Sequence, residues 1–200
     1  MAADHLSMYQ LTVEDGTAFG DRFKRGKLRG LPEEELSADM YALTQDLCEA
    51  AGLPAYEVSN HARPGAESRH NLIYWRGGDY AGVGPGAHGR LTFPTGRWAT
   101  EAPRAPAAWL ERVERDGTGE GPRVRLDAED HALEYLMMSL RLREGLDRGR
   151  HAALAGRPLD ERRVADLREM GMIDTDDERI FATTEGRMVL NSVITALAGA

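Results

Sequence analysis

Residues 6–13, LSMYQLTV, form the segment from which the fold class of this chain follows, because their pattern predicts a β-strand. A turn comes next at residues 14–17, and Pro32 followed by three glutamates marks the start of a helix. Residues 56–59, YEVS, predict a second strand. A strand, a helix and a strand in this order are typical of a parallel βαβ unit, so the sequence predicts an α/β fold.

The helix between these strands carries apolar residues at helical spacing, namely Leu36, Met40, Leu43, Leu47 and Ala51. Gly52 and Pro54 are expected to end it. Cys48 lies on an apolar helical face, which predicts a buried and unreactive thiol. It is the single cysteine of the chain, so this chain alone supplies neither an intrachain disulfide nor the thiolates of an iron–sulfur cluster.

The composition indicates a globular protein of one large or two small domains, with 200 residues, 42% hydrophobic and 29% charged. The net charge of −8 argues against a general nucleic-acid role and against docking on anionic lipid, because both need a basic surface. The longest apolar runs are far below the length of a membrane span. The first residues lack the basic and apolar regions of a signal peptide, so a cytoplasmic location is expected.

Residues 70–75, HNLIYW, combine a histidine, an amide and two large aromatic side chains in six positions. Imidazole is the most common metal ligand among side chains, and Tyr and Trp offer flat apolar faces. His70, Asn71, Tyr74 and Trp75 therefore predict a site for a large, flat ligand that could carry a metal. A structural interpretation stays open, in which His70 is hydrogen-bonded near a strand end and the two aromatic residues belong to the core.

The segment from residue 60 to residue 89 is predicted to be mainly loop, and it ends in a glycine-rich run. Residues 84–89, GPGAHG, match G-x-G-x-x-G, but they precede a predicted hairpin formed by residues 91–93 and 97–99. A dinucleotide-binding fingerprint requires a helix at that place, so this function is disfavoured. Two interpretations remain: a glycine turn at a tight backbone crossing, and a backbone wall for another ligand.

A second domain is predicted after the turn-rich segment at residues 116–122, which gives domains at 1–116 and 117–200. A helix over residues 105–115 precedes this boundary. Beyond it, Asp127 is expected to cap a helix that ends at Gly145, and residues 158–160 to open another that ends at Gly171. A hairpin from residues 172–173 and 180–181 and a final helix capped by Thr184 complete a winged-helix-like, mainly helical arrangement.

A winged-helix arrangement raises the hypothesis of DNA binding, which the charges of this segment oppose. Residues 160–200 contain five basic and nine acidic side chains, a net charge of −4. Such a surface repels phosphate groups, and the predicted wing is acidic. A packing or lid function for this domain is therefore favoured over DNA binding.

Four motifs in this order resemble those of the radical SAM haem chaperone family HemW, whose members were long described as similar to oxygen-independent coproporphyrinogen III oxidase. They are HLSMYQLTVE at 5–14, YEVSN at 56–60, HNxxYW at 70–75 and GVGxGAHG at 82–89. The resemblance covers nearly the whole chain. It implies the C-terminal part of an open radical SAM β/α barrel, followed by a small winged-helix-like domain.

The resemblance also implies roles for individual residues. His70 would be the axial ligand of haem iron, Asn71 would orient the segment or a propionate, and Tyr74 and Trp75 would pack on the porphyrin ring. Thr12 and the backbone of Ala87 and His88 match positions that contact SAM in related enzymes. The C-x-x-x-C-x-x-C segment that holds the family's [4Fe-4S] cluster does not occur in this sequence, so catalysis by this chain alone is not expected.

The implied function is that of a haem chaperone, which captures haem and transfers it to acceptor haem proteins without changing the porphyrin covalently. The alternative is a part of an oxygen-independent coproporphyrinogen III oxidase, which decarboxylates propionates by SAM-dependent radical chemistry. The expected partners are haem, acceptor haem proteins and the N-terminal half of a longer protein. Without that half, an open sheet exposes an edge and apolar surface, so poor solubility or self-association is expected.

Overall fold

The computed structural model of the chain describes residues 3–9 and 13–199. The chain divides into two compact units, Met1–Glu67 and Ser68–Ala200. The domain boundary predicted between residues 116 and 117 stays a prediction. None of the helices in the described residues is long and apolar enough to cross a membrane.

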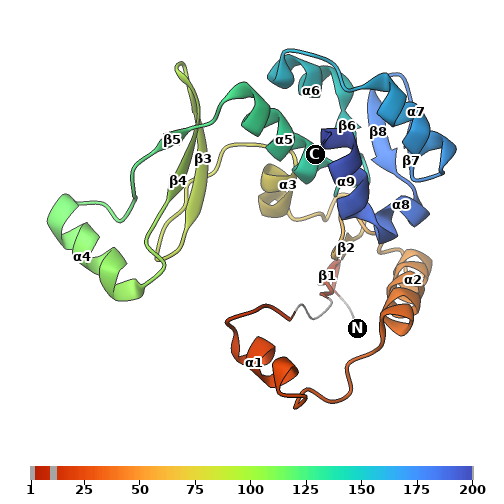
Figure 1. Cartoon of the computed structure of the whole chain (residues 1–200), viewed down its shortest axis with the longest axis horizontal. Helices are drawn as coiled ribbons and strands as arrows, with labels where there is room; N and C mark the ends of the chain where they lie inside the picture. Colours follow the sequence, from red (N-terminus) through yellow and green to blue (C-terminus); the bar gives the residue numbers. More distant parts are fainter. Residues whose placement is uncertain (1–2, 10–12, 200) are drawn as a thin grey trace. The chain divides into compact units, whose positions relative to one another are not determined.

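The first unit contains a small two-stranded sheet and two helices (Figure 1). Strand β1 pairs with β2 in antiparallel orientation, with Leu6 opposite His61. The elements are β1 (His5–Ser7), α1 (Ala18–Lys24), α2 (Glu34–Ala50) and β2 (Asn60–Ala62). Helix α1, which the sequence analysis did not predict, follows the expected turn at residues 14–17, and its start is capped by Thr17, whose hydroxyl accepts from the Gly20 amide.

The predicted parallel βαβ unit is wrong, because the chain reverses direction before the second strand forms. Residues 56–59 are a turn and not a strand: Ala55 forms an antiparallel bridge with His61, and the Tyr56 amide donates to the Asn60 carbonyl over 3.1 Å. The strand therefore begins at Asn60 and runs antiparallel to β1. The predicted strand at residues 6–13 extends only to Ser7, and residues 10–12, including Thr12, lie outside the described part of the chain.

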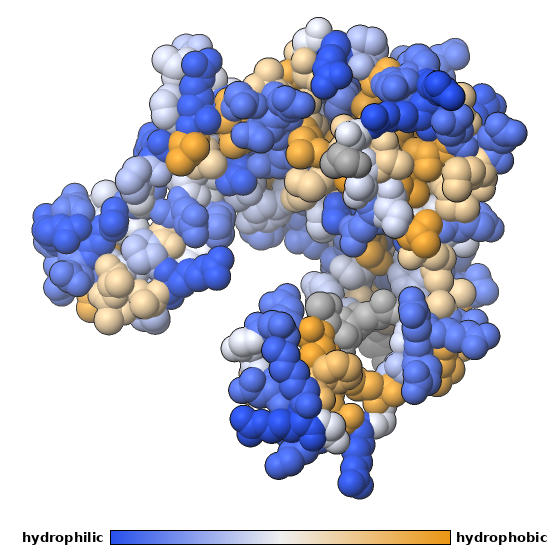
Figure 2. Space-filling view, viewed as in Figure 1, coloured by the Kyte–Doolittle hydropathy of each residue, from blue (hydrophilic) through white to orange (hydrophobic). Residues whose placement is uncertain are grey.

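The predicted helix after Pro32 is confirmed as α2, but its apolar stripe stays exposed. Leu36, Met40, Leu43 and Leu47 keep 53%, 53%, 56% and 61% of their surface exposed. A neighbouring face of the helix packs inward, where Cys48 is buried as predicted and Gln45 lies 3.3 Å from His61 Nε2. Figure 2 shows hydrophobic surface over both helices of this unit. An exposed apolar stripe of this kind favours association with another apolar surface.

We expect the stripe to cause self-association of the isolated chain, because each molecule can cover the stripe of another. The double variant Leu43→Glu and Leu47→Glu should shift the chain from oligomer to monomer in light scattering coupled to gel filtration. The matched variant Ala42→Glu and Asp46→Ala, on another face of the helix, should leave the mass distribution unchanged. A monodisperse wild-type monomer would contradict the prediction.

The second unit begins with a helix and a three-stranded antiparallel sheet. The hairpin expected around Pro94 is confirmed, with Phe93 opposite Gly96 at its end. The predicted helix over residues 105–115 is confirmed as α4, which ends at Gly117 in the left-handed region with φ of 72°. The elements are α3 (Arg69–Trp75), β3 (His88–Phe93), β4 (Gly96–Glu101), α4 (Pro106–Asp116) and β5 (Val124–Arg125).

Helices and a second three-stranded sheet form the rest of this unit, in the strand order β6-β8-β7 (Figure 1). This is the predicted winged-helix-like arrangement, with the expected hairpin between β7 and β8. The elements are α5 (Ala128–Ser139), β6 (Leu146–Asp147), α6 (Arg148–Ala155), α7 (Glu161–Glu169), β7 (Ile173–Thr175), β8 (Arg179–Ala182), α8 (Thr184–Met188) and α9 (Leu190–Ala198).

Three boundaries in this region differ from the prediction. Asp127 caps α5 as expected, but the helix ends at Ser139, because turns replace it before Gly145. The final helix is capped by Thr183 instead of Thr184 and divides at Val189, whose φ of −121° is not helical. Helix α6 was not predicted at all.

The core of this unit lies where α5, the second sheet and α9 meet. Its most deeply buried apolar residues have between 0% and 2% of their surface exposed, and they are Leu136, Leu140, Leu142, Leu146, Ile173, Ile180 and Val193. Burial of this set holds the helices and the sheet together, since each large apolar side chain contributes roughly 1.5–3 kcal/mol.

Candidate functional site

The HNLIYW motif folds as a short helix, α3, and not as the loop that the sequence predicted. Ser68 caps its start, where the hydroxyl accepts from the amide of Asn71 over 3.3 Å. Gly77 follows its end with φ of 62°, a conformation that glycine adopts without strain. A serine cap and a following glycine are the local signals of a helix of this length, and they were available in the sequence.

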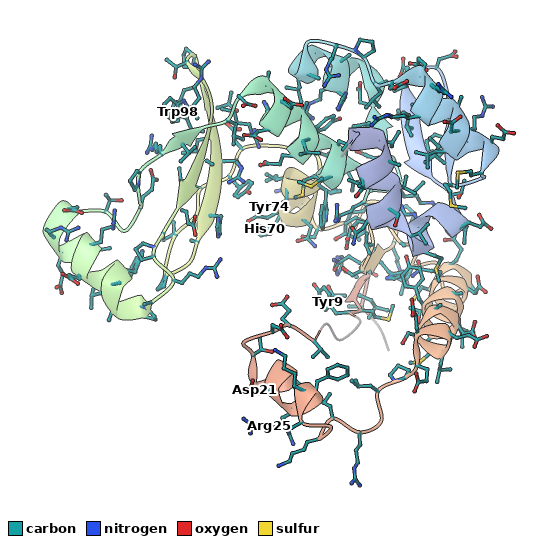
Figure 3. All side chains as sticks on the ribbon, viewed as in Figure 1. Tyr9, Asp21, Arg25, His70, Tyr74 and Trp98 are labelled. Atoms are coloured by element: carbon teal, nitrogen blue, oxygen red, sulfur yellow. The ribbon has the colours of Figure 1, made fainter. Side chains whose placement is uncertain are left out.

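The helix places His70 and Tyr74 on one face, one turn apart (Figure 3). Nε2 of His70 lies 3.1 Å from the hydroxyl of Tyr74, and their rings meet edge to face with centroids 4.8 Å apart. The ring of Tyr80 continues the contact, 4.3 Å from the ring of Tyr74. We call His70, Tyr74 and Tyr80 the ring cluster. Tyr80 was not among the predicted site residues.

The ring cluster is open to solvent on the histidine side. His70 is exposed, whereas Asn71, Tyr74 and Trp75 are partly buried. Ile73, one turn from His70 on the outer side, keeps 43% of its surface exposed. A ligand can therefore reach the imidazole directly and rest on an apolar neighbour. The structure brings all four predicted haem residues into one helix, with Asn71 and Trp75 one helical turn apart.

The hydroxyl of Tyr74 orients the imidazole of His70. When Nε2 accepts from the hydroxyl, Nδ1 carries the proton; when Nε2 donates, Nδ1 holds the free lone pair that a metal ion needs. A hydrogen bond to one ring nitrogen thus selects which nitrogen binds a metal. Burial raises the pKa of Tyr80, against the opposing charge of Arg90, so this phenol stays protonated at neutral pH.

A buried arginine network fixes the turn that carries Tyr80. The guanidinium of Arg97, with 5% of its side chain exposed, donates to Asp79 Oδ1 over 2.9 Å and to the Gly78 carbonyl over 2.9 Å. Burial of Asp79 would raise its pKa, but hydrogen bonds from Thr92 and the charge of Arg97 outweigh it and hold the pKa below the usual value. Sequence reasoning missed this network, because its members lie far apart in the chain.

The glycine-rich run is a tight backbone crossing, as one of the two interpretations stated. A β-carbon on Gly82 would overlap the carbonyl oxygen of His88, and one on Gly89 would lie 2.5 Å from Thr100 Oγ1. Tyr80 and Arg90 exchange two backbone hydrogen bonds of 2.8 Å beside this crossing. Strand β3 follows where a dinucleotide fingerprint requires a helix, so that function finds no support.

The residues matched to SAM contacts lie at the start of β3. The Ala87 carbonyl accepts from the Ala102 amide over 2.8 Å, and the Ala87 amide donates to the Gly84 carbonyl over 3.3 Å. His88 is exposed and lies 4.0 Å from Glu101. Both backbone groups of Ala87 are thus already hydrogen-bonded. A SAM contact at Ala87 and His88 stays a prediction, and Thr12 lies outside the described residues.

An iron–sulfur cluster does not fit the part of the chain that the structure describes. Three thiolates are needed, and Cys48 is buried in α2. Within residues 3–9 and 13–199, no three histidine, cysteine or acidic side chains come together in a way that could hold a metal ion.

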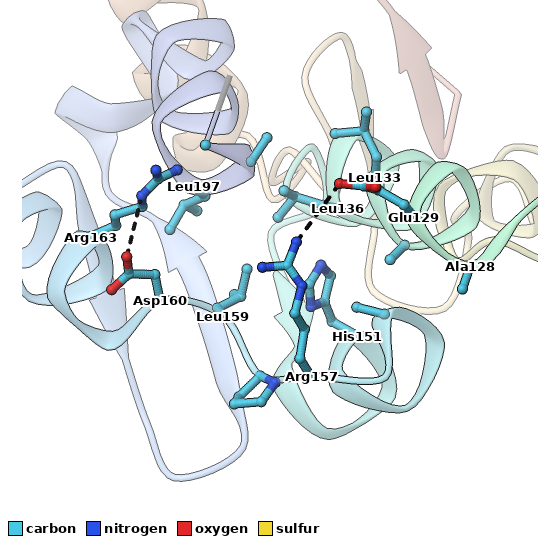
Figure 4. Close-up of a pocket in the computed structure, with 15 residues that line it drawn as sticks. Ala128, Glu129, Leu133, Leu136, His151, Arg157, Leu159, Asp160, Arg163 and Leu197 are labelled. Carbon is cyan, nitrogen blue, oxygen red and sulfur yellow. Dashed lines mark ion pairs between the residues drawn. The ribbon is translucent and has the colours of Figure 1, made fainter.

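A cavity of about 520 Å³ lies elsewhere in the second unit, between α5, α6, α7 and α9 (Figure 4). Its rim carries two ion pairs, Arg157 with Glu129 at 3.8 Å and Arg163 with Asp160 at 3.5 Å. Burial, together with the charge of Arg157, lowers the pKa of His151 in its wall. None of the described residues predicted for the site lines this cavity, so the ring cluster remains the candidate functional site.

Known proteins with similar sequences cover nearly the whole chain. The model of the family called HemN C-terminal domain matches residues 126–189. The heme chaperone HemW of Mycobacterium tuberculosis is 38% identical, over 98% of this chain and 48% of that protein. HemW of Bacillus subtilis is 32% identical, over 98% of this chain and 52% of its own length. The chain is homologous to the HemW proteins.

The relationship to HemW extends beyond bacteria. A zebrafish relative, the mitochondrial radical S-adenosyl methionine domain-containing protein 1, is 36% identical over 96% of this chain and 45% of its own length. The chain therefore spans about half the length of the curated relatives it matches. The sequence-based resemblance to HemW is confirmed.

A solved structure shares the fold. Coproporphyrinogen III oxidase HemN from Escherichia coli, described as a radical SAM enzyme, matches with a TM-score of 0.72 and 18% identity, over 98% of this chain and 48% of that one. The predicted fold class is confirmed: the chain is α/β and then mainly helical, as in the part of HemN that it matches. The parallel pairing predicted within it is the part that the structure corrects.

Proposed function

We propose that this chain is the haem-binding part of a HemW-like haem chaperone, which captures haem and passes it to acceptor haem proteins. The ring cluster carries the proposal, because it joins the exposed imidazole of His70 to the aromatic faces of Tyr74 and Tyr80. His70 and Tyr74 belong to the segment that matches the HNxxYW motif of that family. Homology to proteins named heme chaperone HemW supports it. The porphyrin would be passed to the acceptor protein without covalent change.

In this mechanism His70 binds the iron through the ring nitrogen that Tyr74 leaves free. Ile73 and Tyr74, which flank His70 on α3, contact one porphyrin face, and Asn71 offers an amide to a propionate. An exposed helix covers only one face of the macrocycle, whereas a cofactor pocket buries most of its ligand. The second face would stay accessible to an acceptor protein, and one axial bond is readily exchanged. Reversible binding of this kind favours the transfer of haem to an acceptor protein.

SAM and a [4Fe-4S] cluster belong to the proposal only for a longer protein. A bound cluster with SAM supplies one-electron chemistry, and the residues described here do not provide its three thiolates. We propose that the other half of the relatives' length packs on the apolar stripe of α2. We also propose a cytoplasmic location, although the animal relatives are mitochondrial by name.

A haemin titration followed by absorbance tests the proposed function. We expect a shifted Soret band that saturates at one haemin per chain. Iron-free protoporphyrin IX is the matched ligand control, and it should bind at least about tenfold more weakly because it cannot gain the axial bond. A band that grows linearly without saturation, or equal binding of both porphyrins, would contradict the proposal.

A further inference from the structure

The end of the motif helix is held by an arginine of the C-terminal helices. Arg150, on α6, donates from Nη1 to the Arg76 carbonyl over 2.7 Å and from Nη2 to the Gly77 carbonyl over 3.1 Å. Its guanidinium also lies over the ring of Tyr135 on α5, 4.3 Å from the ring centroid. We call Arg150, Tyr135 and these two carbonyls the arginine clamp.

A second arginine strengthens the same attachment. Arg76, the residue that caps the end of α3, donates from Nε and Nη2 to the two carboxylate oxygens of Glu144, over 2.8 and 2.7 Å. The hydrogen bond from Arg76 lowers the pKa of Glu144, so this carboxylate stays charged well below neutral pH. Gly77 packs closely against Tyr135 of the clamp, since a β-carbon at residue 77 would lie 3.2 Å from Tyr135 Cδ2.

Helix α3 needs such an attachment because it is short. It has seven residues, fewer than an isolated helix requires to be stable in water. The carbonyls at a helix end have no partner within the helix and carry partial negative charge. The carbonyls that Arg150 binds belong to Arg76, which caps α3, and to Gly77, the next residue. The guanidinium therefore ties down the chain directly after the helix and places a positive charge at its C-terminal end. The ring of the buried Tyr135 lies under the guanidinium and favours its position through a cation–π contact.

We propose that Arg150 is the positioning residue of the haem site, which holds α3 in its helical form and so sets the affinity of His70 for haem. Only the part of this proposal that concerns haem affinity rests on the proposed function; the positioning of α3 by Arg150 does not. The C-terminal helices thereby influence the ring cluster through α3, without contacting the haem. The affinity of the sequence motif for haem then depends on the C-terminal helices.

The substitution Arg150→Lys tests the clamp without removing the charge. An ammonium group cannot donate to both carbonyls in one plane while it stacks on Tyr135. The control is Arg148→Lys, the same change on the same helix, where the arginine pairs with Glu161 of α7 instead. If the substitution acted only by destabilising α6, both variants would show the same change in hydrogen exchange and in haemin binding.

Hydrogen exchange of the haem-free chain is the first measurement. We expect Arg150→Lys to speed exchange of the α3 amides by at least about tenfold, with the α5 amides unchanged, while Arg148→Lys leaves α3 as in wild type. In the haemin titration, the dissociation constant should then rise about tenfold for Arg150→Lys only. Slow α3 exchange in Arg150→Lys, or equally fast exchange in Arg148→Lys, would overturn the positioning role.

The two measurements separate this proposal from the proposed function. If wild type fails to bind haemin, the function and the haem part of this proposal fail together, while the exchange rates of α3 still decide whether Arg150 positions the helix. If wild type binds haemin and Arg150→Lys binds it equally well despite a loosened α3, the link between the clamp and affinity is overturned and the function stands.

Discussion

The variant His70→Ala should lose the shifted Soret band that we expect from the wild-type chain with haemin. Among the residues of α3, His70 is the exposed imidazole, and its loss removes the axial bond to iron while the aromatic faces remain. The dissociation constant should rise at least about a hundredfold, the factor for a lost interaction of about 2.7 kcal/mol. Absorbance titration of both chains measures the difference.

Two further variants make this result specific to the ring cluster. Tyr74→Phe keeps the ring but removes the hydroxyl that orients His70, so the Soret band should move yet persist. His5→Gln alters a histidine of the other compact unit and retains a partner for Tyr56, so binding should be as in wild type. Identical spectra for His70→Ala and wild type would remove His70 as the ligand.

Gly82→Ala should destabilise the second unit by about 3 kcal/mol, near the upper end of the range for overpacking a closed site. The new methyl group would overlap the carbonyl oxygen of His88 and lie 2.7 Å from its carbonyl carbon. These contacts are backbone atoms at the start of β3, so neither side can yield without breaking the pairing of Tyr80 with Arg90. Urea denaturation followed by circular dichroism measures the loss.

The neighbouring residue provides the control for this substitution. Val83 keeps 89% of its surface exposed, so Val83→Ala should change the free energy of unfolding by no more than about 0.5 kcal/mol. Because Tyr80 stands next to the crossing, Gly82→Ala should also weaken haemin binding. A Gly82→Ala chain as stable as wild type would show that the crossing opens easily.

Local signals predicted much of the secondary structure correctly. The Pro94-Thr95-Gly96 turn joins its hairpin, and Asp127 and Asp160 cap α5 and α7 through hydrogen bonds to their own first turns. Each of these features depends on residues within a few positions of one another. Helix α6 escaped prediction because its apolar pattern is short, and its cap, Asp147, is itself the last residue of a strand of two residues.

His70 and Tyr74 of the candidate site were among the predicted site residues, but the helix that joins them and the contact with Tyr80 were not predicted. His70 and Tyr74 stand four positions apart, and their contact follows once the segment is helical. Tyr80 joins them only because Arg97 holds the turn at Asp79, and Arg150 reaches α3 from a position more than seventy residues away. Contacts between distant residues leave no periodic pattern in a single sequence, so these partners could not be predicted.

Some properties of this chain follow from the order of its residues. The spacing of caps, turns and apolar side chains specifies most helices and hairpins, and the ordered motifs identify the family, because both depend on local chemistry. Other properties arise only when the chain has folded. The antiparallel pairing of β1 with β2, the outward stripe of α2 and the attachment of α3 by Arg150 depend on which distant surfaces meet. That choice is set by the packing of the whole unit, where each contact competes with all others for the same space.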